Sequence, residues 1–349
     1  MSAASTQVPV DCPEPSFGSD KDGLVWGYRF EPGSPATAID GDGAARMLAE
    51  PVRSDGRGAF LWLHFSLANA AAERWLRQHL ELPESFQAGL AEAASTTRVE
   101  QEGDALVAVI HDVLFEFQFD PSEVSTVCLY VGPRIMVSAR PRPLRTLDRL
   151  RASIKAGVTF ESPADLLAQL LQDQAMVLVG IVRQTTARVD AIEDSVLHRR
   201  VSVSRAELGS LRRLLVRLER LLAPEPASLF RLLSRPPGWI DGRDLQNLRQ
   251  SAEEFSTAVA DSGALVERIK LLQEELAAVI NEQNNRILFL LTLVTVLALP
   301  FNVIAGLFGM NVGGIPFAAH RHGFGIVVSA VAVVTVVGLL AIRRKDWGG

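Results

Sequence analysis

Two uninterrupted apolar runs near the C-terminal end dominate the hydrophobic pattern of the chain. Residues 287–308 are 22 residues without a charged side chain, and residues 324–342 are 19. A helix rises about 1.5 Å per residue, so the first run is about 33 Å long and both can cross a bilayer core of roughly 30 Å. We therefore expect two membrane-spanning helices joined by an outer loop at residues 309–323.

Basic residues beside these runs predict their orientation. Arg343, Arg344 and Lys345 directly follow the second run, and Arg286 precedes the first. Lysine and arginine accumulate at the cytoplasmic ends of membrane helices. Both termini are therefore expected in the cytoplasm, although Arg321 in the loop is a minor contrary signal.

The N-terminal part shows the two-residue alternation and turn signals that are typical of strands. The strand candidates are Leu24–Phe30, Phe60–Phe65, Ala105–Phe119 and Val124–Ala139, the last a hairpin with Gly132-Pro133 as its turn, and helices are expected at Ala44–Glu50 and Ala70–Leu80. This pattern predicts an α/β or α+β domain whose strand order stays open.

Long helical patterns begin after Pro143. Helices are expected at Leu144–Lys155, at Asp165–His198, and from a cap at Ser202 or Ser204 to about Leu222, before Pro224 and Pro226. After a break at residues 233–242, no proline occurs from Arg243 until Pro300, which predicts one very long helix that continues into the first span. Its residues Leu265, Ile269, Leu272, Leu276 and Val279 recur at the spacing of a coiled-coil or bundle seam. A stalk is favoured over a surface helix packed on its own domain.

The expected fold class is an α+β domain followed by long helices and two C-terminal membrane helices. The predicted segments are a disordered tail (1–22), an α/β domain (23–140), a helical region (141–242), a stalk helix that becomes the first span (243–308), the outer loop (309–323), the second span (324–342) and a basic tail (343–349).

Composition excludes several classes of protein. The net charge of -5 argues against nucleic-acid binding. The sequence contains no Walker loop, no His-Glu-x-x-His and no nucleophile elbow, so we expect neither an enzyme nor a bound cofactor. The chain opens without an apolar leader, so its N-terminal part is expected in the cytosol. Cys12 and Cys128 fit no ligand pattern, and Cys128, in an apolar run, is expected to be a buried, inert thiol.

A polar stripe follows one face of the first span. At 100° per residue, eight positions fall within about 120° of arc: Asn285, Leu288, Thr292, Thr295, Leu299, Asn302, Gly306 and Gly309. Polar groups in a membrane helix normally face protein or water. The stripe therefore indicates either a pore lining or a helix contact whose threonine hydroxyls bond back to their own backbone.

A pore would require several copies of the chain, because two spans cannot enclose an aqueous path. Each copy would contribute one first-span helix. Leu288 and Leu299 would then form apolar rings that close by dewetting. Asn302 follows the Pro300-Phe301 break, where the carbonyl of Val296 loses its donor and a polar neighbour can compensate.

The run Ala298-Leu-Pro-Phe-Asn-Val-Ile-Ala-Gly-Leu-Phe-Gly-Met-Asn311 closely resembles the CorA superfamily of metal-ion transporters. The Gly-Met-Asn tripeptide ends the first of two C-terminal spans and is followed by a short basic tail after the second, as in that superfamily. Further similarity includes Val189-Asp190-Ala-Ile192-Glu193 and Leu211–Pro224. The resemblance covers about residues 140–349, and more loosely the preceding domain.

The resemblance implies a funnel-shaped homopentamer in a bacterial inner membrane, with Gly309, Met310 and Asn311 around the outer mouth. Asparagine carbonyls there would accept hydrogen bonds from the water shell of a divalent cation. The continuation Val312-Gly-Gly-Ile-Pro316 resembles the ZntB branch, which implies zinc uptake coupled to protons. The loop holds no carboxylate, so a ring that concentrates cations is missing.

Other residues are weaker candidates for binding metal. His320 and His322 flank Arg321 and could bind zinc, or could simply be polar residues of a loop. Acidic residues on the long helix could line the funnel, report ion levels, or form a solvated face: Glu253, Glu254, Asp261, Glu267, Glu274, Glu275 and Glu282. Glu282, one turn before Asn285, is the first choice, whereas Asp190, Glu193 and Asp194 are expected to support helix packing and ion pairs.

Two rival functions remain open from the sequence. A channel for magnesium, cobalt or nickel, driven by the membrane potential, shares every feature except the Val-Gly-Gly-Ile-Pro loop. A membrane-anchored sensor or scaffold belongs to another class, and it leaves the polar stripe and the Gly-Met-Asn sequence unexplained.

Overall fold

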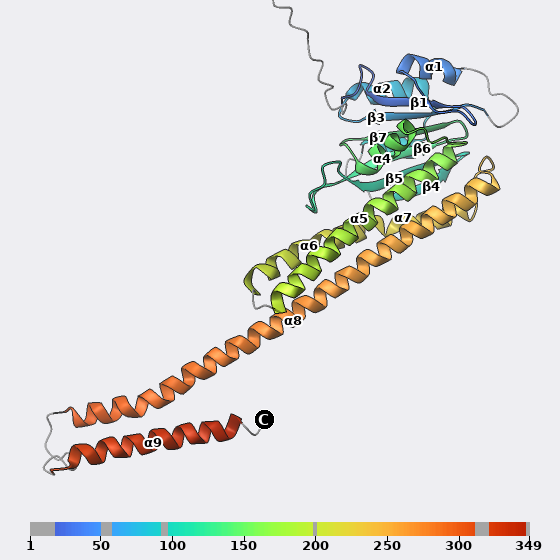
Figure 1. The fold of residues 1–349 in the computed structure, drawn as a ribbon. Coiled ribbons are helices and arrows are strands. Elements are labelled where there is room, and N and C mark those ends of the chain that lie inside the picture. Colours follow the sequence, from blue (N-terminus) through green and yellow to red (C-terminus); the bar gives the residue numbers. More distant parts are fainter. Residues whose placement is uncertain (1–17, 50–57, 92–96, 198–200, 311–320, 347–349) are drawn as a thin grey trace, which may run out of the picture. The chain divides into compact units, whose positions relative to one another are not determined.

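A computed structural model describes residues 18–49, 58–91, 97–197, 201–310 and 321–346. The chain forms two compact units, one up to Gln273 and one from Glu274 onward. The first unit holds a sheet and its covering helices, and the second holds the apolar C-terminal helices (Figure 1).

The first unit is built on a seven-stranded sheet with the order β2-β1-β3-β7-β6-β5-β4. The strands are β1 (Leu24–Phe30), β2 (Thr37–Ala38), β3 (Phe60–Ser66), β4 (Arg98–Glu102), β5 (Ala105–Val113), β6 (Val124–Val131) and β7 (Ile135–Arg140). All neighbouring pairs are antiparallel except β3 and β7, which run parallel.

Helices cover both faces of this sheet because alternate side chains of each central strand point to opposite sides. Leu61, Leu63 and Phe65 of β3 pack with helices α1 (Gly41–Ala49), α2 (Ala70–His79) and α3 (Glu84–Ala91). Phe60 and Trp62 point the other way, toward α4 (Arg145–Lys155) and α5 (Pro163–Leu197). This arrangement confirms the predicted mixture of strands and helices.

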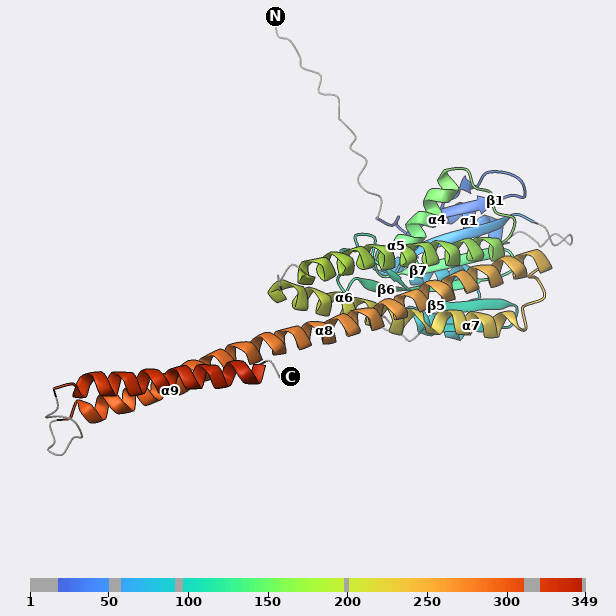
Figure 2. The ribbon, with the colours of Figure 1, turned by 60° about the horizontal axis from the view of Figure 1, so that its bottom comes forward.

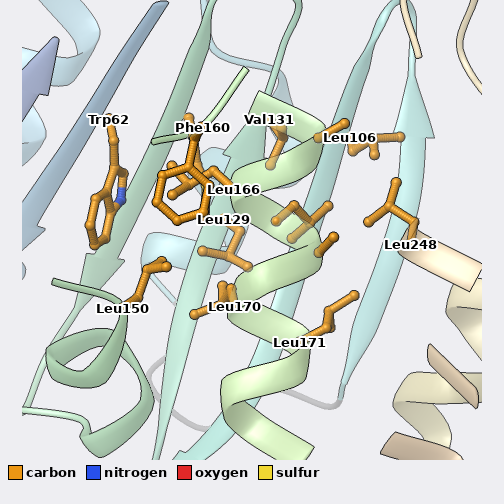
Figure 3. Close-up of a cluster of buried hydrophobic side chains, with 14 of the residues drawn as sticks. Trp62, Leu106, Leu129, Val131, Leu150, Phe160, Leu166, Leu170, Leu171 and Leu248 are labelled. Carbon is orange, nitrogen blue, oxygen red and sulfur yellow. The ribbon is translucent and has the colours of Figure 1, made fainter. Parts of the chain in front are cut away.

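The larger core joins the sheet to the helical region. Leu129 and Val131 of β6 meet Leu166 and Leu170 of α5, and Leu248 of α8 (Gly242–Phe308) lies beside them (Figure 3). Residues from both sides of the predicted boundary at 140/141 therefore share one core. The division into seven segments itself stays a prediction.

A second cluster joins α5, α6 (Val201–Leu222) and α8. Phe255 of α8 is fully buried with Leu214 and Leu218 of α6 and Leu178 of α5. The predicted seam continues this packing, since Leu265, Ile269 and Leu272 are 6%, 0% and 7% exposed. These three residues thus pack within the first unit, as in a helix packed on its own domain, and the stalk stays a prediction. Farther along, Leu276 is buried and Val279 is half-buried.

The strand predicted for Ala105–Phe119 is too long, because β5 ends at Val113. The amide of Phe117 bonds to the carbonyl of Leu114 at 3.1 Å, and Phe119 has a φ of 69°. A turn therefore replaces the extended chain, although apolar residues continue through Leu114, Phe115, Phe117 and Phe119. The Gly132-Pro133 turn is confirmed, since Gly132 N donates to Ile135 O at 2.8 Å.

Four elements were not predicted: β2, α3, β4 and α7 (Pro224–Leu233). Strand β4 is mostly exposed and polar, and so lacks an apolar pattern. The sequence predicts a helix end before Pro224 and Pro226, but Pro224 occupies the first turn of α7, where its missing N–H costs nothing. The side chain of Cys128 is 2% exposed, and burial raises its thiol pKa to about 12, as expected for an inert cysteine.

Candidate functional site: the apolar helices and their polar stripe

Two described helices contain a window long and apolar enough to cross a membrane, α5 and α8. The window of α5 is 61% buried inside the first unit, as in the core helix of a soluble domain. The window of α8 has a mean hydropathy of 2.5 and is 0% buried. Exposed apolar surface on this scale requires another apolar environment, which for α8 is a bilayer or further protein.

Helix α9 (Gly323–Asp346) lies alongside the C-terminal part of α8 in both views (Figures 1 and 2). The apolar stretch of its described side chains covers Gly323–Val337. Its least exposed positions recur every four residues: Gly323, Val327, Val331 and Thr335. Such spacing marks the face of a helix that contacts a neighbour.

The burial pattern of α8 also shows which of its faces contacts α9. Between residues 285 and 309, only Leu293, Leu297, Pro300 and Ile304 are half-buried, and all others are exposed. These four positions share one face, again at three- and four-residue spacing. They mark the side of α8 that lies against α9.

The polar stripe lies on the other side of α8. On a helical wheel with 100° per residue, the centre of the polar stripe is about 150° from the centre of the four half-buried positions. All eight of its members are exposed, including Leu288 at 59% and Leu299 at 62%. The chain's own second apolar helix therefore leaves the polar face of the first uncovered.

The threonine hydroxyls of this face bond back to their own helix. Thr292 Oγ1 donates to Leu288 O at 2.8 Å, and Thr295 Oγ1 donates to Leu291 O at 2.9 Å. Each oxygen keeps lone pairs that can accept from water or from another chain. Thr335 of α9 makes the same bond to Val331 O at 2.8 Å, so back-bonding does not by itself distinguish a pore from a packed face.

The end of α8 is set by local geometry. Pro300 lies inside the helix, where it removes one amide donor, and Asn302 is exposed nearby. Gly309 N donates to Ala305 O at 2.9 Å, and a Cβ on Gly309 would lie 3.0 Å from that oxygen. A side chain at residue 309 would thus crowd the last turn before Met310, which is 52% exposed.

Some predicted site residues lie outside the described residues, among them Asn311 and His320. His322 is described and exposed just before α9. The seven acidic residues predicted on α8 are all exposed, including Glu282. In the part of the chain that the structure describes, no group of three or more His, Cys, Asp or Glu side chains is placed to hold a metal ion.

Two of the acidic residues expected to support helix packing and ion pairs form such pairs, and these pairs join α5 to α8. Arg268 of α8 contacts Asp190 Oδ1 and Glu193 Oε2 of α5, both at 2.7 Å through Nη2. All three side chains are about half exposed, which makes this a surface ion-pair network rather than a buried one. It ties α8 to the far end of α5.

Comparison with known proteins places this geometry in a family. Residues 57–344 match the family model "CorA-like Mg2+ transporter protein". The chain is 28% identical over 334 residues to the "Divalent cation transporter CmaX" of Pseudomonas aeruginosa, covering 94% of this chain and 98% of the other. It is 25% identical over 294 residues to the "Zinc transport protein ZntB" of Pectobacterium atrosepticum, covering 82% and 87%.

Solved structures agree in fold. Full-length CmaX superposes with a TM-score of 0.78 at 25% identity, covering 94% of this chain and 99% of that one. The CorA magnesium transporter of Methanocaldococcus jannaschii gives 0.74 at 20% identity, covering 92% and 98%. The resemblance to the CorA superfamily and its ZntB branch, read from the Gly-Met-Asn run, is thereby confirmed. This chain belongs to the family of CorA-like Mg2+ transporter proteins.

Proposed function

We propose that this chain transports divalent cations across a bacterial inner membrane, with zinc as the preferred cargo and uptake as the direction. The observation that carries the proposal is the polar stripe of α8, which α9 leaves uncovered, in a chain of this family. The names of its ZntB relatives support zinc.

The transport path requires several copies of the chain. Each copy brings one α8 helix whose polar stripe turns toward a common axis, while its half-buried face rests on its own α9. A homo-oligomer, and specifically a pentamer, gives such an axis and places α9 on the lipid side. The last turn of α9 contains Arg343, Arg344 and Lys345, which hold this end of the helix on the cytoplasmic side, the side of the first unit.

Along the axis, the cation meets residues of different chemistry in turn. Gly309, Met310 and Asn311 form the outer mouth, where the amide oxygen of Asn311 accepts from metal-bound water. Asn302, Thr295 and Thr292 offer further oxygens, and Gly306 widens the path because it has no side chain. The Leu299 side chains of the several copies form one ring, and the Leu288 side chains form another. When the leucines within a ring approach one another, they exclude water and close the pore.

Coupling to protons rests on the similarity to the ZntB branch alone. No carboxylate in residues 309–323 concentrates dications at the mouth. Asn285 and Glu282 then lie at the inner end of the path, where a carboxylate attracts the departing cation.

A second candidate rests on the CmaX comparison. CmaX shares more identical residues over more of the chain than the ZntB of Pectobacterium does, and its name specifies only a divalent cation. A channel for magnesium, cobalt or nickel, driven by the membrane potential, is therefore the alternative.

Matched threonine-to-valine variants separate a pore lining from a packed face. Thr292→Val and Thr295→Val together remove two hydroxyls from the stripe without changing side-chain shape, and Thr335→Val removes the same back-bonded hydroxyl from α9. Suppose that each hydroxyl stabilises the hydrated ion in the pore by about 0.7 kcal/mol. Loss of both then costs about 1.4 kcal/mol, and the double variant should lower zinc flux into proteoliposomes about tenfold.

The α9 variant should leave the zinc flux unchanged. Equal fluxes in the double variant and in Thr335→Val would place the stripe in a packing contact and remove the basis of the proposed pore.

A further inference from the structure

A buried polar cluster lies where the turn between α6 and α7 meets the sheet. Glu225, in the first turn of α7, is 0% exposed. Its Oε1 accepts from the backbone N of His111 on β5 at 2.8 Å, and its Oε2 accepts from Nε2 of Gln174 on α5 at 2.8 Å. One carboxyl group therefore ties α7 to both the sheet and α5.

A second chain of hydrogen bonds fixes the state of the His111 ring. Its Nδ1 lies 3.0 Å from Thr97 Oγ1, and that hydroxyl lies 2.9 Å from the carbonyl of Leu221 at the end of α6. A hydroxyl has one proton, which it gives to the carbonyl, so Nδ1 must carry the proton of its own bond. The same Nδ1 is 3.9 Å from Glu225 Oε1.

Asp112 adds a second buried carboxyl group. It is 6% exposed, and its oxygens accept from Val113 N and from Thr146 N at the start of α4, both at 2.8 Å. A cavity of about 10 Å³ beside it is lined by His111, Asp112 and Gln174 together with apolar side chains. Gln174 Oε1 is buried without a hydrogen-bond partner within the described structure.

The elements packed around Glu225 bring one acidic and two basic residues near the cluster. Asp112 of β5 raises the pKa of Glu225, Arg145 of α4 lowers the pKa of Asp112, and Arg217 of α6 lowers the pKa of His111. Helix α5 contributes the neutral Gln174. Among the described residues, no lysine or arginine forms an ion pair with Glu225.

Burial governs the protonation of all three groups. It raises the pKa of Glu225 well above its usual value, an effect that the His111 and Gln174 bonds oppose and Asp112 adds to. Burial raises the pKa of Asp112 to about 6, and burial with Arg217 lowers the pKa of His111. A neutral Glu225 beside a neutral imidazole is therefore the favoured state at mildly acidic pH.

We propose that Glu225, His111 and Asp112 form a buried proton-binding site that couples pH to the docking of the α6–α7 turn on the sheet. With the proton bound, the site holds one carboxylate at most. When the pH rises, Glu225 ionises beside ionised Asp112, and two like charges share a buried space. The contact between the α6–α7 turn and the sheet then weakens, and the end of α6 and the start of α7 move away from the sheet.

Infrared spectroscopy of the full-length protein tests the proton directly. The carbonyl stretch of a protonated carboxylic acid should persist in the wild-type chain at pH values well above the usual pKa of about 4.3. Glu225→Gln should lower the intensity of that band, leaving only the part that Asp112 and other buried acids contribute, whereas Glu100→Gln on the exposed strand β4 should leave the intensity unchanged. A wild-type spectrum without this band at pH 6.5, or a band of equal intensity in Glu225→Gln and in the wild type, overturns the proposal.

A second variant keeps the test independent of whether Glu225→Gln folds. Thr97→Val removes the acceptor of His111 Nδ1 and frees that N–H to donate to Glu225 Oε1, which stabilises the carboxylate. The loss of the acid band should therefore shift to lower pH in this variant. Hydrogen exchange of residues 221–233 should accelerate at the same pH as the band disappears. An exchange rate that does not change at this pH overturns the proposed coupling between protonation and docking of the turn. The infrared and exchange measurements are both independent of metal transport.

Discussion

Replacing Ile269 with alanine should destabilise the first unit strongly, because this residue is fully buried in the α5–α6–α8 bundle. The change removes three carbon atoms, worth about 0.8 kcal/mol each, or about 2.4 kcal/mol in transfer free energy. The residual cavity adds to this, so the expected loss is about 3 to 4 kcal/mol of the free energy of unfolding.

Leu271 gives a matched control two residues along the same helix. It is 64% exposed, so only about a third of its apolar surface is removed from solvent in a single chain. The same transfer scale predicts a loss below about 1 kcal/mol for Leu271→Ala. The comparison isolates burial, because the two side chains have the same number of carbon atoms.

Guanidinium unfolding of the purified full-length chain in detergent, followed by near-ultraviolet circular dichroism, measures the difference. The midpoint of Ile269→Ala should fall at every protein concentration, since the seam is buried within one chain. A loss that appears only at low protein concentration would show that the seam instead joins different copies. Equal, small losses in both variants would refute the assigned burial.

Three further predictions concern individual contacts. Arg268→Ala should cost about 1 kcal/mol, because it breaks two half-exposed ion pairs to α5, and the loss should shrink at high salt in the same unfolding assay. Asp112 has a raised pKa, so its contribution to stability is greatest below pH 4 and is lost as the pH rises toward 6. The loss reaches about 3 kcal/mol, and unfolding midpoints of Asp112→Asn should lack this part of the pH dependence. Cys128 should resist maleimide at neutral pH until the chain unfolds, measured by mass spectrometry in a Cys12→Ser background; rapid labelling of the folded chain would contradict its burial.

The sequence predicted those elements whose pattern matches their environment. The unbroken run from Arg243 to Pro300 predicts α8 because nothing within it interrupts helical hydrogen bonding. The run Ala105–Phe119 misleads at its end, since apolar composition alone does not distinguish β5 from the turn that follows. Strand β4 could not be predicted, because an exposed edge strand needs backbone pairing and shows no apolar face.

The candidate site was predicted only in part for a similar reason. A helical wheel identifies the polar stripe from Asn285 to Gly309, but it cannot say which face α9 covers. That information lies in the half-buried positions Leu293 and Ile304, which are as apolar as their neighbours. Glu225 escaped notice because its place between two prolines suggested a helix end, not a buried carboxyl group that bonds to a strand far away in the sequence.

Zinc and magnesium entry into proteoliposomes that carry the purified chain, with and without an inward proton gradient, tests the central claim most directly. Zinc entry should increase with the gradient, and an Asn311→Ala variant should abolish it. Magnesium entry that ignores the gradient and follows a negative interior potential would contradict the zinc assignment and identify a channel instead.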